Sequence, residues 1–398
     1  MRKGWEYKKL GEVCDVINGL WIGKKEPFIN VAVIRNTNFS KDCQLNLDKV
    51  AFIDVEVKQF ASKKLKFGDI IIEKSGGSEK QPVGRPILFN ISDGNYSFSN
   101  FTSTLRIKDN TEVNSAYLHK CLYAFYLKGE TIKLQSKTTG LHNLNIKGYL
   151  RLNIPLPPLS TQLAIVSELD KINKLIRLKK EQLKDFDNLA QSLFYEMFGD
   201  PVENEKGWEV KKLNEIVSDN CSISYGIVQP GDGVENGVPV VRPVDMTKTF
   251  VSRKGLKNTT KEISDSYKRT ILKGNEILMC VRGTTGLISM ATPELQGCNV
   301  TRGIAPIECG PTCDKWFVFY QILNPAIQHH IAEYTRGIAL KQINMKDVRD
   351  IPLCLPPLSL QRLFAQRIEQ IEREKSEVQK SIQDLETLLA SRMQYWFE

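Results

Sequence analysis

Two polar segments that contain glycine carry the residues with the clearest chemical potential in this chain. They are residues 73–85, EKSGGSEKQPVGR, and residues 280–286, CVRGTTG. Glycine lets a backbone approach a phosphate closely, Lys and Arg neutralise phosphate charge, and Gln or Arg can hydrogen-bond a base edge through two atoms. Both segments therefore have the residue types of a nucleic-acid contact.

Three further polar segments recur in both halves in the same order. The first pair contains Arg35 and Arg242, each directly after a β-branched run. The second pair is residues 99–104 and 299–303, and the third is residues 137–145 and 336–344. Taken alone, each loop is more often an ordinary solvated turn, and either arginine is equally a structural salt-bridge partner. Because the frame repeats while the side chains change, we interpret the segments as two readers of different nucleotide sequences. The predicted DNA-binding residues are Arg35, Asn36, Lys74, Ser75, Gly76, Gly77, Ser78, Lys80, Gln81, Arg85, Asn100, Thr139, His142, Arg242, Arg282, Gly283, Thr284, Thr285, Asn299, Arg302, Arg336, Lys341 and Gln342.

The chain that must position these segments is duplicated. Residues 3–13 and 206–216 share K-G-W-E-x-K-K-L-x-E, and residues 156–162 and 355–361 share L-P-P-L-S-x-Q. A unit of this length is a whole domain rather than a solenoid repeat. We therefore predict a mixed domain over 1–155, a long helix over 156–199, a second mixed domain over 200–354 and a second long helix over 355–398. A pseudo-symmetric chain of this kind should bind a target that has two parts.

The mixed domains have the pattern of short strands and helices. Residues 68–73 and 274–279 are β-branched or apolar runs between Gly, Asn and Ser clusters, which predicts strands. The apolar spacing predicts helices over 117–127 and 316–332. The predicted fold class is α+β: two pseudo-symmetric α+β domains separated by two long helices that form an antiparallel coiled coil.

The long helices show apolar residues at alternating spacings of three and four, which indicates a coiled-coil seam. Ser160 and Ser359 are the expected N-caps. Lys179, Lys375 and Arg392 interrupt the seam. The predicted seam residues are Ile165, Leu169, Ile172, Ile176, Leu183, Phe186, Phe364, Ile368, Ile371, Val378, Ile382 and Leu385.

The length of these helices suggests their purpose. At 1.5 Å per residue each measures roughly 57 Å, more than a domain of this size requires. B-DNA repeats every ~34 Å, so a rigid rod of this length would hold two readers somewhat over one helical turn apart.

The bulk composition fits a folded protein with two domains. The chain has 398 residues, 41% of them hydrophobic, and a net charge of +9, which is compatible with a nucleic-acid partner. Nine cysteines are scattered without metal-ligand spacing, no signal peptide is recognisable, and no apolar run approaches 18 residues. We therefore expect a cytoplasmic protein with reduced cysteines and no membrane contact.

The sequence contains no recognisable catalytic motif. The four histidines, His119, His142, His329 and His330, form no metal motif, and neither a GxxxxGK[ST] loop nor a dinucleotide or methyl-donor fingerprint is present. We therefore predict a protein that binds, is not an enzyme, and holds no metal or cofactor of its own.

The arrangement resembles the specificity (S) subunit of type I restriction-modification systems. The similarity lies in the duplicated W-E-x-K-K-L-x-E opening, the L-P-P-L-x-x-Q segment before each long helix, and the G-D-I-I-I-x-K-S-G-G-S and R-G-T-T-G loops. It covers essentially the whole chain, in the order target recognition domain, conserved helix, target recognition domain, conserved helix.

The resemblance implies a function and a set of partners. Each recognition domain would read one part of a bipartite, asymmetric target in double-stranded DNA, and the helices would set the gap. Two methyltransferase (M) subunits, which bind S-adenosylmethionine and methylate adenine, would dock on the helices, and the ATP- and Mg-dependent restriction (R) subunit would join them. The alternatives are a coiled-coil scaffold between protein partners, without DNA specificity, and a single-chain restriction-methylation fusion. The fusion would need nuclease and methyl-donor motifs that the sequence lacks.

Overall fold

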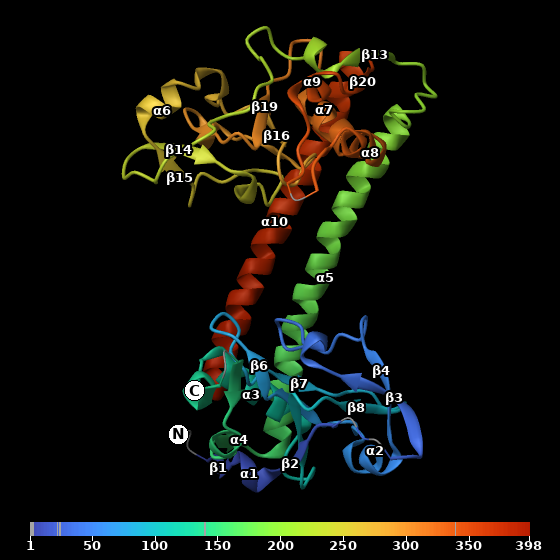
Figure 1. The fold of residues 1–398 in the computed structure, drawn as a ribbon, viewed down its shortest axis with the longest axis vertical. Helices are drawn as coiled ribbons and strands as arrows, with labels where there is room; N and C mark the ends of the chain where they lie inside the picture. Colours follow the sequence, from blue (N-terminus) through green and yellow to red (C-terminus); the bar gives the residue numbers. More distant parts are fainter. Residues whose placement is uncertain (1–3, 22, 24, 139–140, 339) are drawn as a thin grey trace. The chain divides into compact units, whose positions relative to one another are not determined.

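The structure is a computed structural model that describes residues 4–21, 23, 25–138, 141–338 and 340–398 (Figure 1). The chain forms two compact units. Unit 1 is Met1–Leu178 with Ser381–Glu398, and unit 2 is Lys179–Lys380. Each unit contains one mixed domain and a part of each long helix, so the division falls within the helices.

Unit 1 contains short strands and a few helices. The strands are β1 (Glu6–Lys9), β2 (Cys14–Asn18), β3 (Phe28–Ile34), β4 (Ala51–Glu56), β5 (Ile70–Glu73), β6 (Ser75–Gly77), β7 (Pro86–Leu88), β8 (Tyr96–Phe98), β9 (Thr102–Ile107), β10 (Gln135–Thr138), β11 (Leu141–Leu144) and β12 (Asn153–Leu156). The helices are α1 (Leu10–Val13), α2 (Val57–Lys63), α3 (Ser115–Leu127), α4 (Ile146–Tyr149) and the long α5 (Leu159–Phe198), which continues into unit 2.

Unit 2 repeats this arrangement with fewer regular strands. The strands are β13 (Glu209–Lys212), β14 (Val238–Val241), β15 (Lys257–Thr259), β16 (Ile277–Cys280), β17 (Ile288–Met290), β18 (Asn299–Val300), β19 (Ile304–Ile307) and β20 (Pro352–Leu355). The helices are α6 (Lys261–Asp265), α7 (Lys315–Leu323), α8 (Pro325–Glu333), α9 (Met345–Arg349) and the long α10 (Leu358–Phe397).

Strand pairing shows the duplication directly. In unit 1, β3 pairs antiparallel with β4 and parallel with β8, while β5 lies between β7 and β9. In unit 2, β14 pairs antiparallel with β15 and parallel with β18, while β16 lies between β17 and β19. The same connectivity in both units confirms two pseudo-symmetric α+β domains.

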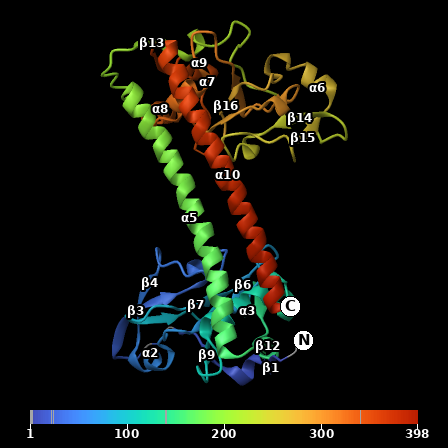
Figure 2. The ribbon, with the colours of Figure 1, turned by 180° about the vertical axis from the view of Figure 1, so that it is seen from behind.

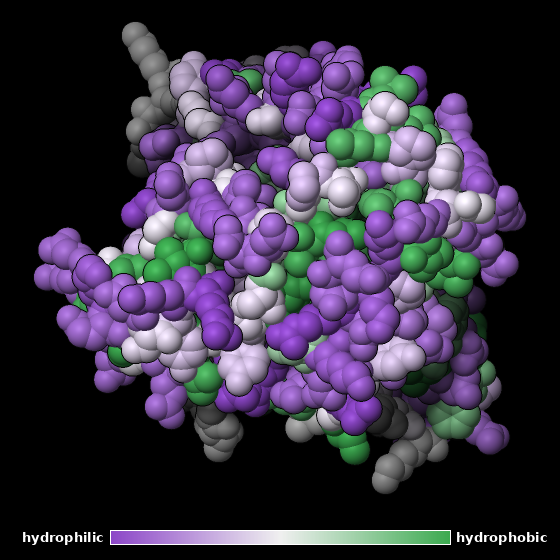
Figure 3. All heavy atoms as spheres, turned by 90° about the horizontal axis from the view of Figure 1, so that it is seen from above, coloured by the Kyte–Doolittle hydropathy of each residue, from purple (hydrophilic) through white to green (hydrophobic). Residues whose placement is uncertain are grey.

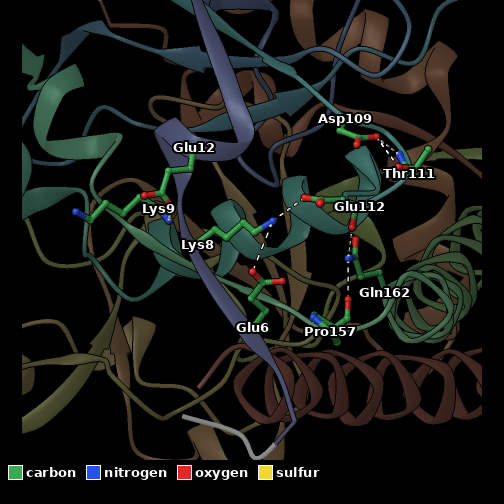
Figure 4. A network of polar contacts seen from close by, with 9 residues as sticks. All are labelled: Glu6, Lys8, Lys9, Glu12, Asp109, Thr111, Glu112, Pro157 and Gln162. Atoms are coloured by element: carbon green, nitrogen blue, oxygen red, sulfur yellow. Dashed lines mark hydrogen bonds and ion pairs between the residues drawn. The ribbon is translucent and has the colours of Figure 1, made fainter.

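The two repeated sequence motifs lie side by side in each unit. The opening strand β1 pairs with β12, which leads into α5, and β13 pairs with β20, which leads into α10. The Gln that ends the second motif is fully buried in both units. In unit 1, Gln162 Nε2 donates to the carbonyls of Pro157 (2.9 Å) and Glu112 (2.8 Å) (Figure 4). Its Oε1 accepts from Asn114 N (2.9 Å).

Gln361 makes the equivalent contacts in unit 2. Its Nε2 donates to the Pro356 carbonyl (2.7 Å), and its Oε1 accepts from the backbone N–H of Asp314 (2.9 Å). Asn114 and Asp314 are the N-caps of α3 and α7. The amide shared by the two halves therefore joins the start of each long helix to the start of a domain helix, which gives the repeated motif the same structural role in both units.

The long helices run antiparallel, as contacts within each unit show. In unit 1, Glu168 near the start of α5 pairs with Arg392 near the end of α10. In unit 2, the later residue Asp187 pairs with the earlier residue Lys375 (2.8 Å). Of the predicted seam residues, nine are buried and Leu183, Phe186 and Leu385 are half-buried. The two helices are the green and red ribbons of Figures 1 and 2.

Two local predictions about helices were wrong. The long helices begin at Leu159 and Leu358, so Ser160 and Ser359 lie inside the first turn rather than at the cap. The helix predicted over 316–332 is broken into α7 and α8, because Pro325 has no N–H to continue the first helix and Asn324 caps the second by accepting from Ala326 N (2.9 Å).

One face of the molecule is shown in Figure 3. Seen from above, hydrophilic residues cover most of the visible face, with separate hydrophobic areas between them (Figure 3). Within the described residues, no helix is both long enough and apolar enough to span a membrane.

Candidate nucleic-acid interface

The four polar segments predicted in the first half converge in unit 1. The backbone N–H groups of Lys74 and Ser75 both donate to the Phe101 carbonyl (2.9 and 3.0 Å), and Leu144 N donates to the Lys74 carbonyl (2.8 Å). The side-chain amide of Asn36 donates to the Ser75 carbonyl (2.6 Å). We call residues 35–38, 74–77, 99–101 and 142–144 loop cluster 1.

The hairpin of β10 and β11 extends this cluster. Strand β11 pairs with β6, and the side chain of Ser75 contacts Asn143 Oδ1 (2.5 Å). His142 Nδ1 lies 2.9 Å from Gln135 Oε1. Thr139, predicted as a contact, lies outside the described residues.

The four segments of the second half converge in the same way. Val281 N donates to the Gly303 carbonyl (2.8 Å), and Ile343 N donates to the Val281 carbonyl (3.0 Å). The backbone of Gln342 forms isolated antiparallel β-bridges with Arg282 and with Arg336. A Cβ on Gly303 would lie 2.7 Å from Pro243 Cγ, so the fourth segment is also in contact. We call residues 242–245, 281–286, 301–303, 336–338 and 340–343 loop cluster 2.

Equivalent hydrogen bonds align the two clusters residue by residue. Ser99 N donates to the carbonyl at the end of β3 and Thr301 N to the carbonyl at the end of β14, both at 2.9 Å. Asn100 therefore corresponds to Arg302, and by the same logic Phe101 corresponds to Gly303. The side chains differ although the backbone frame is shared.

The arginines that follow β3 and β14 differ in their availability. Arg242 is held by Asp245 through two side-chain hydrogen bonds (2.9 and 2.7 Å), and this carboxylate raises the pKa of the guanidinium. The position equivalent to Asp245 is Asn38, which accepts only from the backbone N–H of Arg35 (3.0 Å). Arg35 is exposed, and the residues that the structure describes give its side chain no carboxylate partner. Its charge is therefore available, whereas that of Arg242 is largely neutralised.

Two predicted contacts are structural. Arg85 is 5% exposed and forms a two-point ion pair with the buried Glu73 (2.7 and 3.2 Å), with a further hydrogen bond to the Phe39 carbonyl (3.2 Å). Asn299 is fully buried, and its amide holds Thr270 and Ser264. Neither side chain can reach a ligand without unfolding its surroundings, so we withdraw both from the set.

The remaining predicted side chains lie at or near the surface. Lys80, Gln81, Ser78, Thr284, Arg302, Arg336, Lys341 and Gln342 are exposed, and Lys74, Arg282, Asn100, His142 and Thr285 are half-buried. Burial and then the neighbouring Lys63 ammonium lower the pKa of Lys74. Lys63 and Lys74 are therefore neighbouring cations that have no carboxylate partner among the described residues. Such a pair favours the binding of an anion beside it.

The sequence interpretation missed the segments that line the clusters from the other side. Gly19 and Gly226 pack so closely on the strand turn that an added Cβ would lie 1.8 and 1.9 Å from the carbonyl oxygens of Ser99 and Val300. Just beside these glycines lie the exposed Trp21 and Tyr225. The available signal was the pair N-G-L-W and Y-G-I-V, in which an aromatic residue lies within two positions of a glycine.

The described residues contain no group of three or more His, Cys, Asp or Glu arranged to hold a metal ion. All nine cysteines are free, and most are buried. The two loop clusters therefore offer cations, amides, hydroxyls and aromatic rings on a shared frame, which is an arrangement suited to binding a polyanion with bases.

Comparison with known proteins gives the class. Residues 2–185 and 205–387 match the family described as the type I restriction modification DNA specificity domain. Because the two matches cover most of the chain, the protein belongs to this family, as the sequence motifs indicated.

Relatives of known name support the assignment. The type I restriction enzyme EcoBI specificity subunit of Escherichia coli is 24% identical over 58% of this chain, and the match spans about half (53%) of that subunit. Two specificity subunits of Methanocaldococcus jannaschii match further: MjaVIII, 24% identical over 67% of this chain and 69% of its own, and MjaIX, 22% identical over 97% and 91%.

Solved structures share the fold. One is a chain from a study of complex assembly and conformational transition in a type I restriction-modification system, with a TM-score of 0.60 at 18% identity, covering 100% of this chain and 98% of that one. The other is the type I S subunit from M. genitalium, with a TM-score of 0.53 at 14% identity, covering 98% and 95%.

Proposed function

We propose that this chain is the DNA-recognition subunit of a type I restriction-modification complex, in which each loop cluster reads one half of a bipartite target. The observation that supports this most directly is the convergence of four polar segments on one backbone frame in both units, with different side chains at equivalent positions. Arg35, Lys74, Arg282 and Arg302 would supply phosphate or base-edge contacts. No catalytic step is assigned to the chain.

The antiparallel helices would set the unspecified gap between the half-sites. Each has 40 residues, roughly 60 Å at 1.5 Å per residue, which exceeds one turn of B-DNA. Their ends are built into the cores of the units, as Ile165 and Leu169 of α5 pack with Met393 and Phe397 of α10 in unit 1. Helices anchored in this way would transmit a fixed spacing.

The same helices would dock two methyltransferase subunits, and S-adenosylmethionine, ATP and Mg would belong to the partner subunits. Several leucines lie outside the seam and are exposed, which is unusual for solvated helices. They are Leu163, Leu175, Leu178 and Leu189 of α5, and Leu363 and Leu388 of α10. The double substitution Leu175→Ser/Leu178→Ser should reduce co-purification of the methyltransferase subunit, whereas the exposed Lys171→Ser should not.

The test of DNA recognition uses the assembled methyltransferase complex and duplex DNA. Lys74→Ala should weaken binding about uniformly across sequences and reduce the slope of log affinity against log salt by about one, whereas Arg282→Ala should also relax base preference in one half-site. Lys212→Ala is the matched control, because its ammonium is already paired with Asp350 (2.8 Å) outside both clusters. Methylome sequencing of the host with and without the gene would show the bipartite adenine motif.

The scaffold alternative makes the opposite prediction. A coiled-coil protein that joins two partners and ignores DNA would show no steep salt dependence and no motif lost on deletion. If neither Lys74→Ala nor Arg282→Ala changes DNA affinity, the site assignment is wrong.

A further inference from the structure

Loop cluster 1 contains a hydrophobic cavity with aromatic walls. The cavity has a volume of about 460 Å³. Its floor is the small core around Leu20, Val33 and Val55, and its walls are Trp21, Ile53 and Phe101. These three wall residues are 64%, 39% and 44% exposed, which is a large apolar exposure for a polar loop region.

The cavity is held open by contacts already described. Phe101 is fixed because its carbonyl accepts from two consecutive backbone N–H groups, those of Lys74 and Ser75. Asn36 is fixed by its hydrogen bond to the Ser75 carbonyl, which leaves Asn36 Oδ1 without a partner, and Ser99 Oγ also has none. Both of these residues line the cavity.

In unit 2, residues without aromatic rings stand at the positions equivalent to Phe101 and Trp21. Phe101 is replaced by Gly303, Asn36 by Pro243 and Trp21 by Val228, and a Cβ on Gly303 would already touch the Pro243 ring at 2.7 Å. The cavity is therefore a difference between two otherwise equivalent frames, which is where a difference in sequence preference should lie.

The rim of the cavity fits duplex DNA. Arg35, exposed and without a carboxylate partner among the described residues, lies on the lining together with Asn100. Asp54 also lines it, but its carboxylate accepts from the Asn30 side chain (2.7 Å). The Arg35 guanidinium could pair with a DNA phosphate while the apolar wall contacts an apolar group of a nearby base.

Only one base presents an apolar group in the major groove, namely thymine, through its C5-methyl. We propose that the cavity of Trp21, Ile53 and Phe101 receives a thymine C5-methyl of the half-site read by unit 1. This inference rests on the proposed function and adds a base identity to it.

The test replaces single thymines with deoxyuridine, which removes the methyl and changes nothing else. With the wild-type complex, one such replacement in the half-site whose base preference Arg282→Ala leaves unchanged should weaken binding about fourfold, as expected for loss of one buried methyl. Replacements in the other half-site should have smaller effects, because Gly303 and Val228 supply no aromatic wall there.

A substitution in the protein should remove this sensitivity. In Phe101→Ala, deoxyuridine and thymine should bind almost equally at the critical position. Phe67→Ala is the matched control, since Phe67 is an exposed aromatic residue (69%) of unit 1 that does not line the cavity, and it should keep the fourfold difference.

Two results would overturn the inference: insensitivity of the wild-type complex to every deoxyuridine replacement in this half-site, or full sensitivity retained in Phe101→Ala. The first uses the unaltered protein, so a folding defect of the variant cannot obscure it. Absence of any bipartite DNA binding would instead contradict the proposed function itself.

Discussion

At the scale of single residues, Arg85 shows that a segment with the composition of an exposed loop can contain a buried structural residue. It ends a loop rich in Gly, Ser and Lys, yet the chain turns back there and places its guanidinium against Glu73 on the buried strand β5. The Glu73 carboxylate is 1% exposed, and burial raises its pKa against the opposing effect of Arg85. Loss of the arginine would leave an uncompensated buried acid.

Arg85→Ala should therefore destabilise unit 1 by roughly 3–5 kcal/mol, the usual cost of removing one partner of a buried ion pair. The double substitution Arg85→Met/Glu73→Met should recover most of that loss, since no charge remains buried. Urea unfolding of both variants checks this. Equal destabilisation by the single and double variants would contradict the ion-pair explanation.

His119 gives a prediction for pH dependence. Burial in α3 and then the neighbouring Lys120 lower the pKa of His119 to about 4, against about 6.5 in an unfolded chain. Between these values the unfolded state binds a proton that the folded state does not, so the free energy of unfolding falls as the pH drops from 6.5 to 4. The loss should be on the order of 3 kcal/mol, seen as a falling urea midpoint, and His119→Gln should lose this pH dependence.

Some of the residue-scale differences were readable in the sequence and some were not. The availability of Arg35 and the neutralisation of Arg242 follow from the third residue after each, Asn38 or Asp245, because a short 3-10 turn brings that residue back to the arginine backbone. The burial of Asn299 was not readable, since its partners Thr270 and Ser264 lie about 30 residues away. Local spacing reports on turns, and only the fold reports on distant packing.

At the scale of elements, the three residues that interrupt the helix seam behave differently. Lys375 is 8% exposed and lies between Glu372 of its own helix (2.7 Å) and Asp187 of α5 (2.8 Å). Arg392 likewise crosses to Glu168, which also accepts from Trp396 Nε1 (3.0 Å). Lys179 is half-buried and reaches only Gln182 of its own helix (3.2 Å). Two of the three interruptions are therefore cross-helix ion pairs, which can fix the register of a coiled coil.

Substitution of the two lysines should separate these roles. Lys375→Met leaves the largely buried Glu372 carboxylate without its cation, so unit 2 should lose roughly 3 kcal/mol of stability. Lys179→Met, the matched control, should change stability by less than about 0.5 kcal/mol because it breaks no cross-helix pair. Chemical denaturation of the two variants distinguishes them, and similar midpoints would show that the Lys375 pairs contribute nothing.

The elements themselves were well predicted where periodicity was long or strongly β-branched. The long helices, strands β5 and β16, and helix α3 lie where the sequence placed them, because apolar spacing alone specifies them. Strand order was not predictable, since the parallel pairing of β3 with β8 joins residues more than 60 positions apart. The segments of each loop cluster converge because of that pairing. The sequence therefore predicted which residues belong to the clusters, but it could not predict that they lie together.

At the scale of the whole molecule, the end of each long helix lies beside the tryptophan that opens a repeat. In the interior of the chain, α5 ends at Phe198, and the nine residues 199–207 lead to Trp208, whose indole Nε1 donates to the Phe198 carbonyl (2.9 Å). At the ends of the described chain, α10 ends at Phe397, and Trp5, the counterpart of Trp208, stacks on Trp396 with ring centroids 6.4 Å apart. The ends of unit 1 therefore stand as they would if a linker like residues 199–207 joined them.

This arrangement predicts that the chain tolerates circular permutation. The permuted chain would begin at Glu203, end at Val202, and carry a copy of residues 199–205 between Phe397 and Lys3. Val202 and Glu203 are exposed, and the new break leaves the packed partners Pro201 and Trp208 on either side intact. Since every contact of both loop clusters is kept, the permuted subunit should direct methylation to the same half-sites with the same gap, which methylome sequencing of a complemented deletion strain would show.

A break between Leu183 and Lys184 is the control, because it cuts α5 within the seam and should abolish methylation. A soluble permuted chain that methylates a different motif, or none, would mean that covalent order, and not the pseudo-symmetric packing, specifies the target.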